Sequence, residues 1–200
     1  YNNKPIKIHL RKKVLSILLK NNKEDLVIDL VKESRVINKT KGFYSLELGM
    51  HFALNFDFNQ AIKEYLIYLE NNPKNIRLIT QRIMLLTDNL TSTNIIKHEL
   101  AESQLTESKI ILSKLEFKLK NYEESYNILK DIADSDKYKL ELSEDLIKLK
   151  NYTLAHKVID NILDSSNNKK ILNHAIVQLA SLYELKTTES SNNFPISKDI

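Results

Sequence analysis

Three segments of the chain share one spacing of apolar and small residues. Each begins with an aromatic residue, has a small residue three positions later and has a large apolar residue seven positions later. Positions 0, 3 and 7 lie on one face of an α-helix, so the pattern predicts three amphipathic helices that bury the same face. The aligned residues are Phe58, Ala61 and Tyr65; Tyr122, Ser125 and Leu129; and Tyr152, Ala155 and Ile159.

A second predicted helix precedes each of these segments, at residues 42–55, 105–119 and 136–149. Asp57, Asn121 and Asn151 lie at the turns, and they are residue types that cap helix starts. The three aromatic residues are 64 and 30 positions apart. This gives about 32 residues per unit if one degenerate unit lies between. We therefore expect helical hairpins. The clearest units are 42–73, 106–135 and 136–165, and a further repeat at 74–104 is inferred from the spacing.

Two more regions extend the helical pattern. Residues 5–36 form a degenerate predicted hairpin. Residues 168–186 form a long apolar predicted helix with no partner after it. Residues 187–200 have the composition of a flexible tail or linker. The apolar residues of the long helix fall on one stripe: Leu172, Ala175, Ile176, Leu179, Ala180 and Tyr183.

The stretch 44–73 resembles the tetratricopeptide repeat, because its residues match that family's signature: Leu48, Gly49, Phe52, Phe58, Ala61, Tyr65 and Pro73. Gly49 and Ala61 leave room for two helices to cross closely. The later units match less well, with Ser113 and Ser143 at the small position of the first helix. Their second helices contribute Tyr122, Ser125, Tyr152 and Ala155. The resemblance implies an all-α fold over residues 1–186, namely a right-handed α-solenoid of about five antiparallel hairpins plus a final unpaired helix.

Proteins of this family bind partners mainly in the groove that the first helix of each hairpin lines. Some members hold a carboxylate there with lysine and asparagine, but Leu46 and Met50 occupy the matching positions here. A mixed apolar groove suits an extended or helical peptide. The resemblance thus implies a protein–protein interaction scaffold for an unknown protein or peptide. Its implied groove residues are Phe43, Leu46, Met50, Ala53, Ile110, Lys114, Phe117, Leu140, Glu144 and Ile147.

The composition agrees with a helical fold and narrows the chemistry. The chain has only two glycines and three prolines, too few for the tight turns of an all-β domain. It has no cysteine, which excludes disulfides, thiol nucleophiles and thiolate metal sites. No glycine-rich phosphate loop and no metal-binding histidine spacing is present. We expect a chain that is not an enzyme and has no catalytic residues, cofactor or metal.

Positive charge gathers at the start of the chain. Residues 1–23 carry seven lysines and arginines and no acid, whereas the whole chain has a net charge of +4. An apolar stripe runs through the same segment, formed by Ile6, Leu10, Val14, Ile17 and Leu18. The helix at 5–20 could lie on an anionic membrane surface, or its stripe could pack on the next hairpin. We favour packing.

The remaining expectations concern partners and compartment. Nucleic-acid binding is not expected, because only four arginines are present and aromatic residues do not interleave with the basic ones. No apolar run reaches the roughly 20 residues of a membrane span. The absence of cysteine fits the cytoplasm and also export after removal of a signal peptide. The alternative function is a structural spacer whose basic N-terminal helix contacts a membrane surface or a larger assembly.

Overall fold

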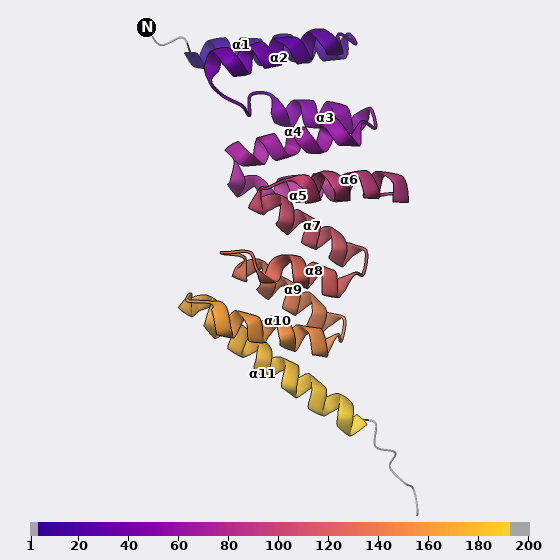
Figure 1. Ribbon diagram of the computed structural model, residues 1–200, viewed down its shortest axis with the longest axis vertical. Coiled ribbons are helices and arrows are strands. Elements are labelled where there is room, and N and C mark those ends of the chain that lie inside the picture. Colours follow the sequence, from indigo (N-terminus) through magenta and orange to yellow (C-terminus); the bar gives the residue numbers. More distant parts are fainter. Residues whose placement is uncertain (1–3, 193–200) are drawn as a thin grey trace, which may run out of the picture. The chain divides into compact units, whose positions relative to one another are not determined.

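The computed structural model describes the backbone of residues 4–192 and the side chains of residues 8–188. The structure is 81% helical, and within the described backbone it has no strand, which confirms the predicted all-α class (Figure 1). The helices are α1 (Lys4–Lys20), α2 (Glu24–Asn38), α3 (Ser45–Leu54), α4 (Phe58–Asn71), α5 (Ile76–Met84), α6 (Leu90–Glu102), α7 (Thr106–Lys118), α8 (Tyr122–Lys130), α9 (Asp136–Lys148), α10 (Tyr152–Ser165) and α11 (Lys169–Asn192), with a 3-10 helix at Pro73–Asn75.

The chain forms two compact units, residues 1–111 and residues 112–200, with the boundary inside α7. In the first unit, α1 packs against α2, α3 packs against α4, and α4 also contacts α5 and α6. In the second unit, α9 and α10 pack together, and α11 contacts both of them. Each unit therefore buries apolar side chains between consecutive helices.

The three repeated aromatic residues each begin a helix, as the sequence pattern predicts. Phe58 is the first residue of α4, Tyr122 of α8 and Tyr152 of α10. The side chain of Asp57 accepts a hydrogen bond from the Gln60 N–H at 3.1 Å, so it caps α4 as expected. Asn151 caps α10 in the same way. Asn121 differs, because its side-chain Nδ2 donates to Glu116 at 2.7 Å.

Four of the helix connections in the described backbone have the same geometry, with a left-handed residue two positions before the next helix begins; the end of α2 has the same bond pair around Lys39, but α3 begins only at Ser45. In the α3–α4 turn, Phe56 has a φ of 61° and its N–H donates to the Ala53 carbonyl at 3.2 Å. The next N–H, of Asp57, donates to the Phe52 carbonyl at 2.9 Å. This pair of bonds satisfies two free carbonyl groups at a helix end. The same bonds surround the left-handed residue of the α1–α2, α7–α8 and α9–α10 turns: Asn22, Lys120 and Lys150.

The left-handed residues of these turns lie at intervals of 34, 64 and 30 residues. The local repeat thus begins within the segment 5–36. The α5–α6 connection, in the region of the inferred repeat, is different. There Asn89 has an extended backbone, and its side chain accepts a hydrogen bond from the Ser92 N–H at 2.9 Å. Residues 74–104 therefore contain two helices without the shared turn.

The crossing of α3 and α4 is as close as the sequence implies. A Cβ built on Gly49 would lie 2.6 Å from the ring of Tyr65, well inside van der Waals contact. Ala61 is completely buried, and Leu48 and Phe52 are buried beside it. Phe58 is half-buried at the start of α4. The first of these helices is shorter than predicted, because Gly42–Tyr44 form a turn before Ser45.

A buried ion pair joins α2 to the α3–α4 pair. The guanidinium of Arg35 contacts the Glu64 carboxylate at 2.5 Å, and it also donates to Ser45 Oγ at 2.9 Å and to the Phe43 carbonyl at 3.1 Å. These contacts satisfy most of the donors of a largely buried Arg35 side chain. Apolar residues from α1 to α4 pack around them: Leu15, Val27, Val31, Phe43, Tyr44, Leu48, Phe52 and Ala61.

In the second unit, serines occupy the close crossings. Ser113 Oγ donates to the Ser125 carbonyl at 2.8 Å and lies 3.0 Å from Ser125 Oγ. Ser143 Oγ donates to the side chain of Gln178 at 2.6 Å, which ties α9 to α11. These buried hydroxyl groups therefore have partners, as buried polar groups require. Ala155 is completely buried in α10.

Candidate protein-binding surfaces

The predicted groove residues of the first unit have unequal exposure. Phe43 and Ile110 are buried, so their side chains belong to the interior. Leu46 and Ala53 are half-buried. Met50 is 37% exposed. Of these five residues, Met50 therefore presents the largest exposed fraction to a partner.

The predicted groove residues of the second unit are also divided. Leu140 is buried, and Phe117 and Ile147 are half-buried, with Phe117 against the ring of Tyr122. Lys114 forms a 2.8 Å ion pair with Glu141 and lies over the Tyr138 ring. Glu144 is exposed and pairs with Lys148 at 3.0 Å. The Lys148 ammonium donates hydrogen bonds to the carboxylates of Glu144 and Asp145, and these bonds raise its pKa. The predicted groove residues of the second unit therefore do not form a continuous apolar groove.

The apolar stripe of α1 does not pack as the sequence led us to expect. Leu10, Val14 and Ile17 are 54%, 51% and 59% exposed. The face that packs is a different one, with Leu15 in the core and Ile8, Leu18 and Leu19 against it. The expectation was correct for Leu18 and wrong for Leu10, Val14 and Ile17. The side chain of Ile6 lies outside the described residues. Because α1 has two apolar faces, one of them remains exposed.

The exposed stripe of α1 continues onto α2. A cavity of about 250 Å³ lies between the two helices, lined on its apolar side by Leu10, Val14, Leu15 and Leu30. Leu26 and Ile37 fall on the same side of α2 as Leu30 by helical spacing, and both are about half exposed. We call this surface the α1–α2 groove and define it by its aliphatic residues: Leu10, Val14, Ile17, Leu26, Leu30 and Ile37.

The two edges of the α1–α2 groove carry opposite charges. Exposed Lys13 and Lys20 lie on α1, and no acid occurs in that helix. On the α2 side, Glu33 lines the cavity and Asp29 is largely exposed. Arg11 lies at the seam and donates to Ser34 Oγ at 3.3 Å. The groove is thus an apolar surface with one basic and one acidic edge.

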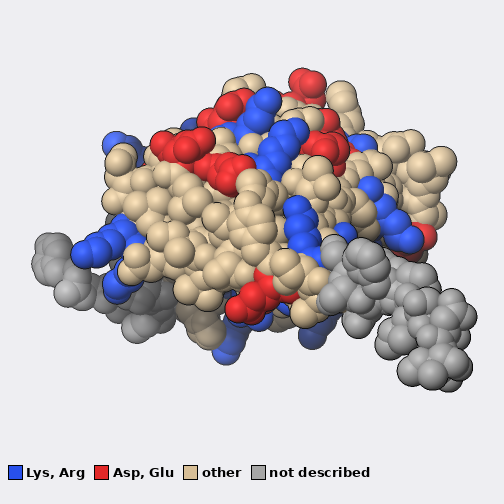
Figure 2. Space-filling view, turned by 90° about the horizontal axis from the view of Figure 1, so that it is seen from below, with Lys and Arg blue, Asp and Glu red and all other residues tan. Residues whose placement is uncertain are grey.

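The outer face of α11 is a second exposed apolar surface. Ile176, Val177 and Tyr183 are 55%, 64% and 50% exposed, and Ala180 is exposed between them. Figure 2 is a view from below Figure 1, where α11 lies. It shows a broad area without Lys, Arg, Asp or Glu, with charged side chains around it. The predicted stripe of this helix is therefore divided, because Leu172, Ala175 and Leu179 face the interior whereas the other three residues face outward. Beyond the stripe, α11 continues to Asn192, into the segment predicted as a tail, and residues 193–200 lie outside the described residues.

Side chains of α10 extend the α11 surface. His156 Nε2 lies 2.8 Å from the Tyr183 hydroxyl, and His156 Nδ1 lies 2.8 Å from Asp160 Oδ2. In the tautomer that carries its proton on Nδ1, the ring donates to the Asp160 carboxylate and Nε2 accepts from the Tyr183 hydroxyl. Sequence analysis missed this contact because α10 and α11 bring the two residues together from 27 positions apart. The contact fixes the Tyr183 ring at the edge of the exposed face.

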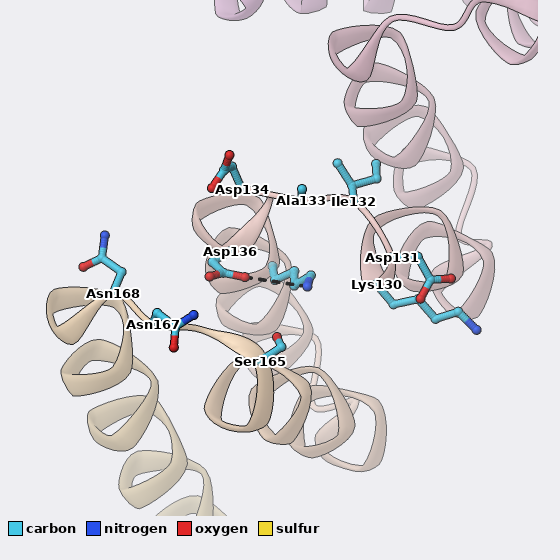
Figure 3. A pocket seen from close by; sticks show the side chains of 10 residues that line it. Lys130, Asp131, Ile132, Ala133, Asp134, Asp136, Ser165, Asn167 and Asn168 are labelled. Carbon is cyan, nitrogen blue, oxygen red and sulfur yellow. Dashed lines mark ion pairs between the residues drawn. The ribbon is translucent and has the colours of Figure 1, made fainter.

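An open pocket of about 580 Å³ lies between the α8–α9 and α10–α11 connections (Figure 3). Its side chains include Asp131, Asp134, Ser165 and Asn167, and an almost completely buried Lys139 that pairs with Asp136. The lining carries three carboxylates and two ammonium groups, so its charge selects no single class of ligand. Within the described residues, no cluster of histidine and acidic side chains could hold a metal ion.

The paired helices define this protein as an all-α chain, and its described side chains form two exposed apolar surfaces, the α1–α2 groove and the outer face of α11. No helix in the described part is long and apolar enough to cross a membrane. A scan of the chain against protein-family models found no match, and a search of curated proteins found none either. The two exposed apolar surfaces are therefore the features of the molecule that bear on its function.

Proposed function

We propose that this chain is a protein–protein interaction scaffold that binds an amphipathic helix of a partner in the α1–α2 groove. In this proposal the helices form a tetratricopeptide-like array, a right-handed α-solenoid of about five antiparallel hairpins plus a final helix. The shared turn of four helix connections and the close α3–α4 crossing support the array. Partner binding in the groove that the first helix of each hairpin would line stays a prediction. Three of its predicted residues, Phe43, Ile110 and Leu140, are buried.

The exposure of Leu10, Val14 and Ile17 is the observation that carries the proposal. Exposing three large aliphatic side chains along one helix is costly in water, and such patches usually mark interaction sites. Two helices that meet at a seam present a groove into which the apolar face of a third helix fits. The cavity lined by Val14 and Leu30 offers space for one anchoring side chain of that helix.

The charged residues at the two edges of the groove favour a partner with complementary charges. A bound helix with acidic residues beside its apolar face would set them against Lys13 and Lys20 of α1. The acidic edge formed by Asp29 and Glu33 would repel an anionic membrane lying flat on the same surface. The observations therefore favour an amphipathic helix with acidic residues on the flank beside α1 and basic residues on the flank beside α2 over a lipid surface.

A titration with designed peptides tests the proposal. Two fluorescent peptides share one apolar face and carry lysines along one flank of it. The other flank carries glutamates in the first, called the acidic peptide, and lysines in the second, called the basic peptide. Fluorescence anisotropy should detect binding of the acidic peptide and at least about tenfold weaker binding of the basic one. Equal affinity for the two peptides, or no binding of either at high micromolar protein, would contradict the proposal.

Variants of the groove locate the binding. Val14→Asp and Ile17→Asp each place a charge in the apolar surface, and both side chains are about half exposed, so the fold should tolerate them. Either change should weaken binding of the acidic peptide at least about tenfold, because an unpaired charge would be buried on binding. Leu54→Asp, at an exposed aliphatic residue of α3, is the matched control and should leave binding unchanged. Cosedimentation with phosphatidylserine vesicles that Val14→Asp abolishes would instead indicate a membrane site.

A further inference from the structure

The outermost side chains of α11 form one stripe with opposite charges at its ends. Lys170, Asn173, Val177, Ala180 and Glu184 are all exposed, and their spacing alternates between three and four residues. This spacing keeps them on one side of the helix, opposite the buried side chains that face α9 and α10. Those buried side chains are Ala175, Gln178 and Leu182.

The two charged residues of the stripe are placed symmetrically. Lys170 and Glu184 each lie seven residues from Val177, so they are about 21 Å apart along the helix. The sequence between them contains no other charged residue. Neither side chain forms an ion pair or a side-chain hydrogen bond with any described residue. Both charges are therefore available to another molecule.

We propose that α11 pairs in antiparallel orientation with α11 of a second copy of this chain, centred on Val177. A two-fold axis at Val177 brings Lys170 of each copy opposite Glu184 of the other, which gives two ion pairs at the ends of an uncharged contact. Ala180 is small enough for the helices to approach closely, and Ile176 and Tyr183 cover one side. A parallel arrangement would oppose like charges, so the charge pattern selects the antiparallel one.

The second copy fits this stripe better than other partners do. An unrelated helix would need an acid and a base at the matching separation and in the reverse order, whereas another copy has both. A lipid surface would gain nothing from the exposed Glu184. This proposal is independent of the α1–α2 groove, so either one can fail without the other.

Sedimentation equilibrium of the full chain at physiological salt tests the pairing. The parent should show a concentration-dependent species of twice the 23.3 kDa chain mass. Glu184→Lys opposes lysine to lysine at both ends and should weaken dimerisation at least about tenfold. Lys170→Glu opposes glutamate to glutamate and should do the same. The double variant Lys170→Glu with Glu184→Lys restores both pairs and should dimerise within about threefold of the parent.

Control variants separate the pairing from general effects of charge. Lys109→Glu changes the net charge as much as Lys170→Glu does, but it lies on α7 and should leave dimerisation unchanged. Circular dichroism should show equal helicity for all variants, since every changed residue is exposed. A parent that stays monomeric to several hundred micromolar would overturn the proposal. So would a dimer that the single reversals leave intact, or one that Val14→Asp abolishes while Glu184→Lys does not.

Discussion

The α3–α4 crossing and the α7–α8 crossing bring two helices together with different residues. Gly49 lies at the first crossing, where a Cβ would approach the Tyr65 ring to 2.6 Å. The residue 64 positions later is Ser113, at the second crossing, and its hydroxyl bonds to Ser125. The residue that matches Tyr65 is Leu129. A larger side chain in one helix is thus accompanied by a smaller one in the other.

This comparison shows what a close helix crossing requires. The pair of facing residues must have a limited total volume, because the interior is close-packed. Glycine lies against the large tyrosine at the first crossing, whereas the second crossing has serine at the glycine position and the smaller leucine at the tyrosine position. Polarity is not excluded, since the Ser113 hydroxyl finds an acceptor within the crossing. A single small-residue rule therefore covers both crossings, although only the first closely matches the tetratricopeptide pattern.

The largest expected effect comes from filling the α3–α4 crossing. Ala61→Phe introduces a ring where the parent side chain is completely buried, and we expect a loss of about 3 kcal/mol or more in the free energy of unfolding. Thermal melting measures the change. Gln60→Phe, at the exposed neighbouring position, is the control and should stay within about 0.5 kcal/mol of the parent. A small loss of unfolding free energy in Ala61→Phe would show that α3 and α4 can move apart at little cost.

A second prediction places the serine and leucine of the α7–α8 crossing at the matching positions of the α3–α4 crossing. Gly49→Ser alone should destabilise the chain by about 1–3 kcal/mol, because its Cβ would clash with the Tyr65 ring. Combining Gly49→Ser with Tyr65→Leu reproduces the residues of the α7–α8 crossing. Denaturant unfolding of the parent, the two single variants and the double variant should then show that the double loses less than the sum of the singles. Additive losses would mean that the two volumes do not compensate each other.

A third prediction concerns the polar contact that only the α7–α8 crossing has. Ser113→Ala removes the donor to the Ser125 carbonyl and should lower the free energy of unfolding by about 1–2 kcal/mol. Ser125→Ala breaks only the contact between the two hydroxyl groups, so it should cost less. Denaturant unfolding of both singles and the double gives their coupling. If Ser113→Ala is neutral, small size alone explains the serine.

Helix starts could be predicted from the sequence because their causes are local. Phe58, Tyr122 and Tyr152 each follow a short polar residue and open a helix with the same buried face. The interactions that fix such a start involve residues within one turn of it. The all-α class follows from the same periodicity. The shared left-handed residue could not be predicted, because none of these residues is glycine and the type varies: asparagine at 22, phenylalanine at 56, and lysine at 120 and 150.

The exposed surfaces were harder to predict because a helix with two apolar faces does not reveal which one packs. In α1, Leu15 packs and Ile17 is exposed, although both are aliphatic. The choice depends on α2 and α3, which meet α1 only in the folded chain. A usable signal was present, since α1 has more aliphatic residues than one stripe can hold. The burial of Phe43 has a related cause, since this residue precedes the observed start of α3 and packs in the core.

The smallest expected effect tests the one feature that both crossings share, their turn. Lys120 has a φ of 66°, which costs a residue with a Cβ free energy that glycine does not lose. Lys120→Gly should therefore raise the free energy of unfolding by up to about 1 kcal/mol, reduced by the greater freedom of glycine in the unfolded chain. Phe56→Gly in the α3–α4 turn should gain less, because it also removes the edge-to-face contact between Phe56 and Phe58. Denaturation midpoints of the two variants measure the difference. A loss of stability in Lys120→Gly would show that the left-handed turn does not strain this lysine.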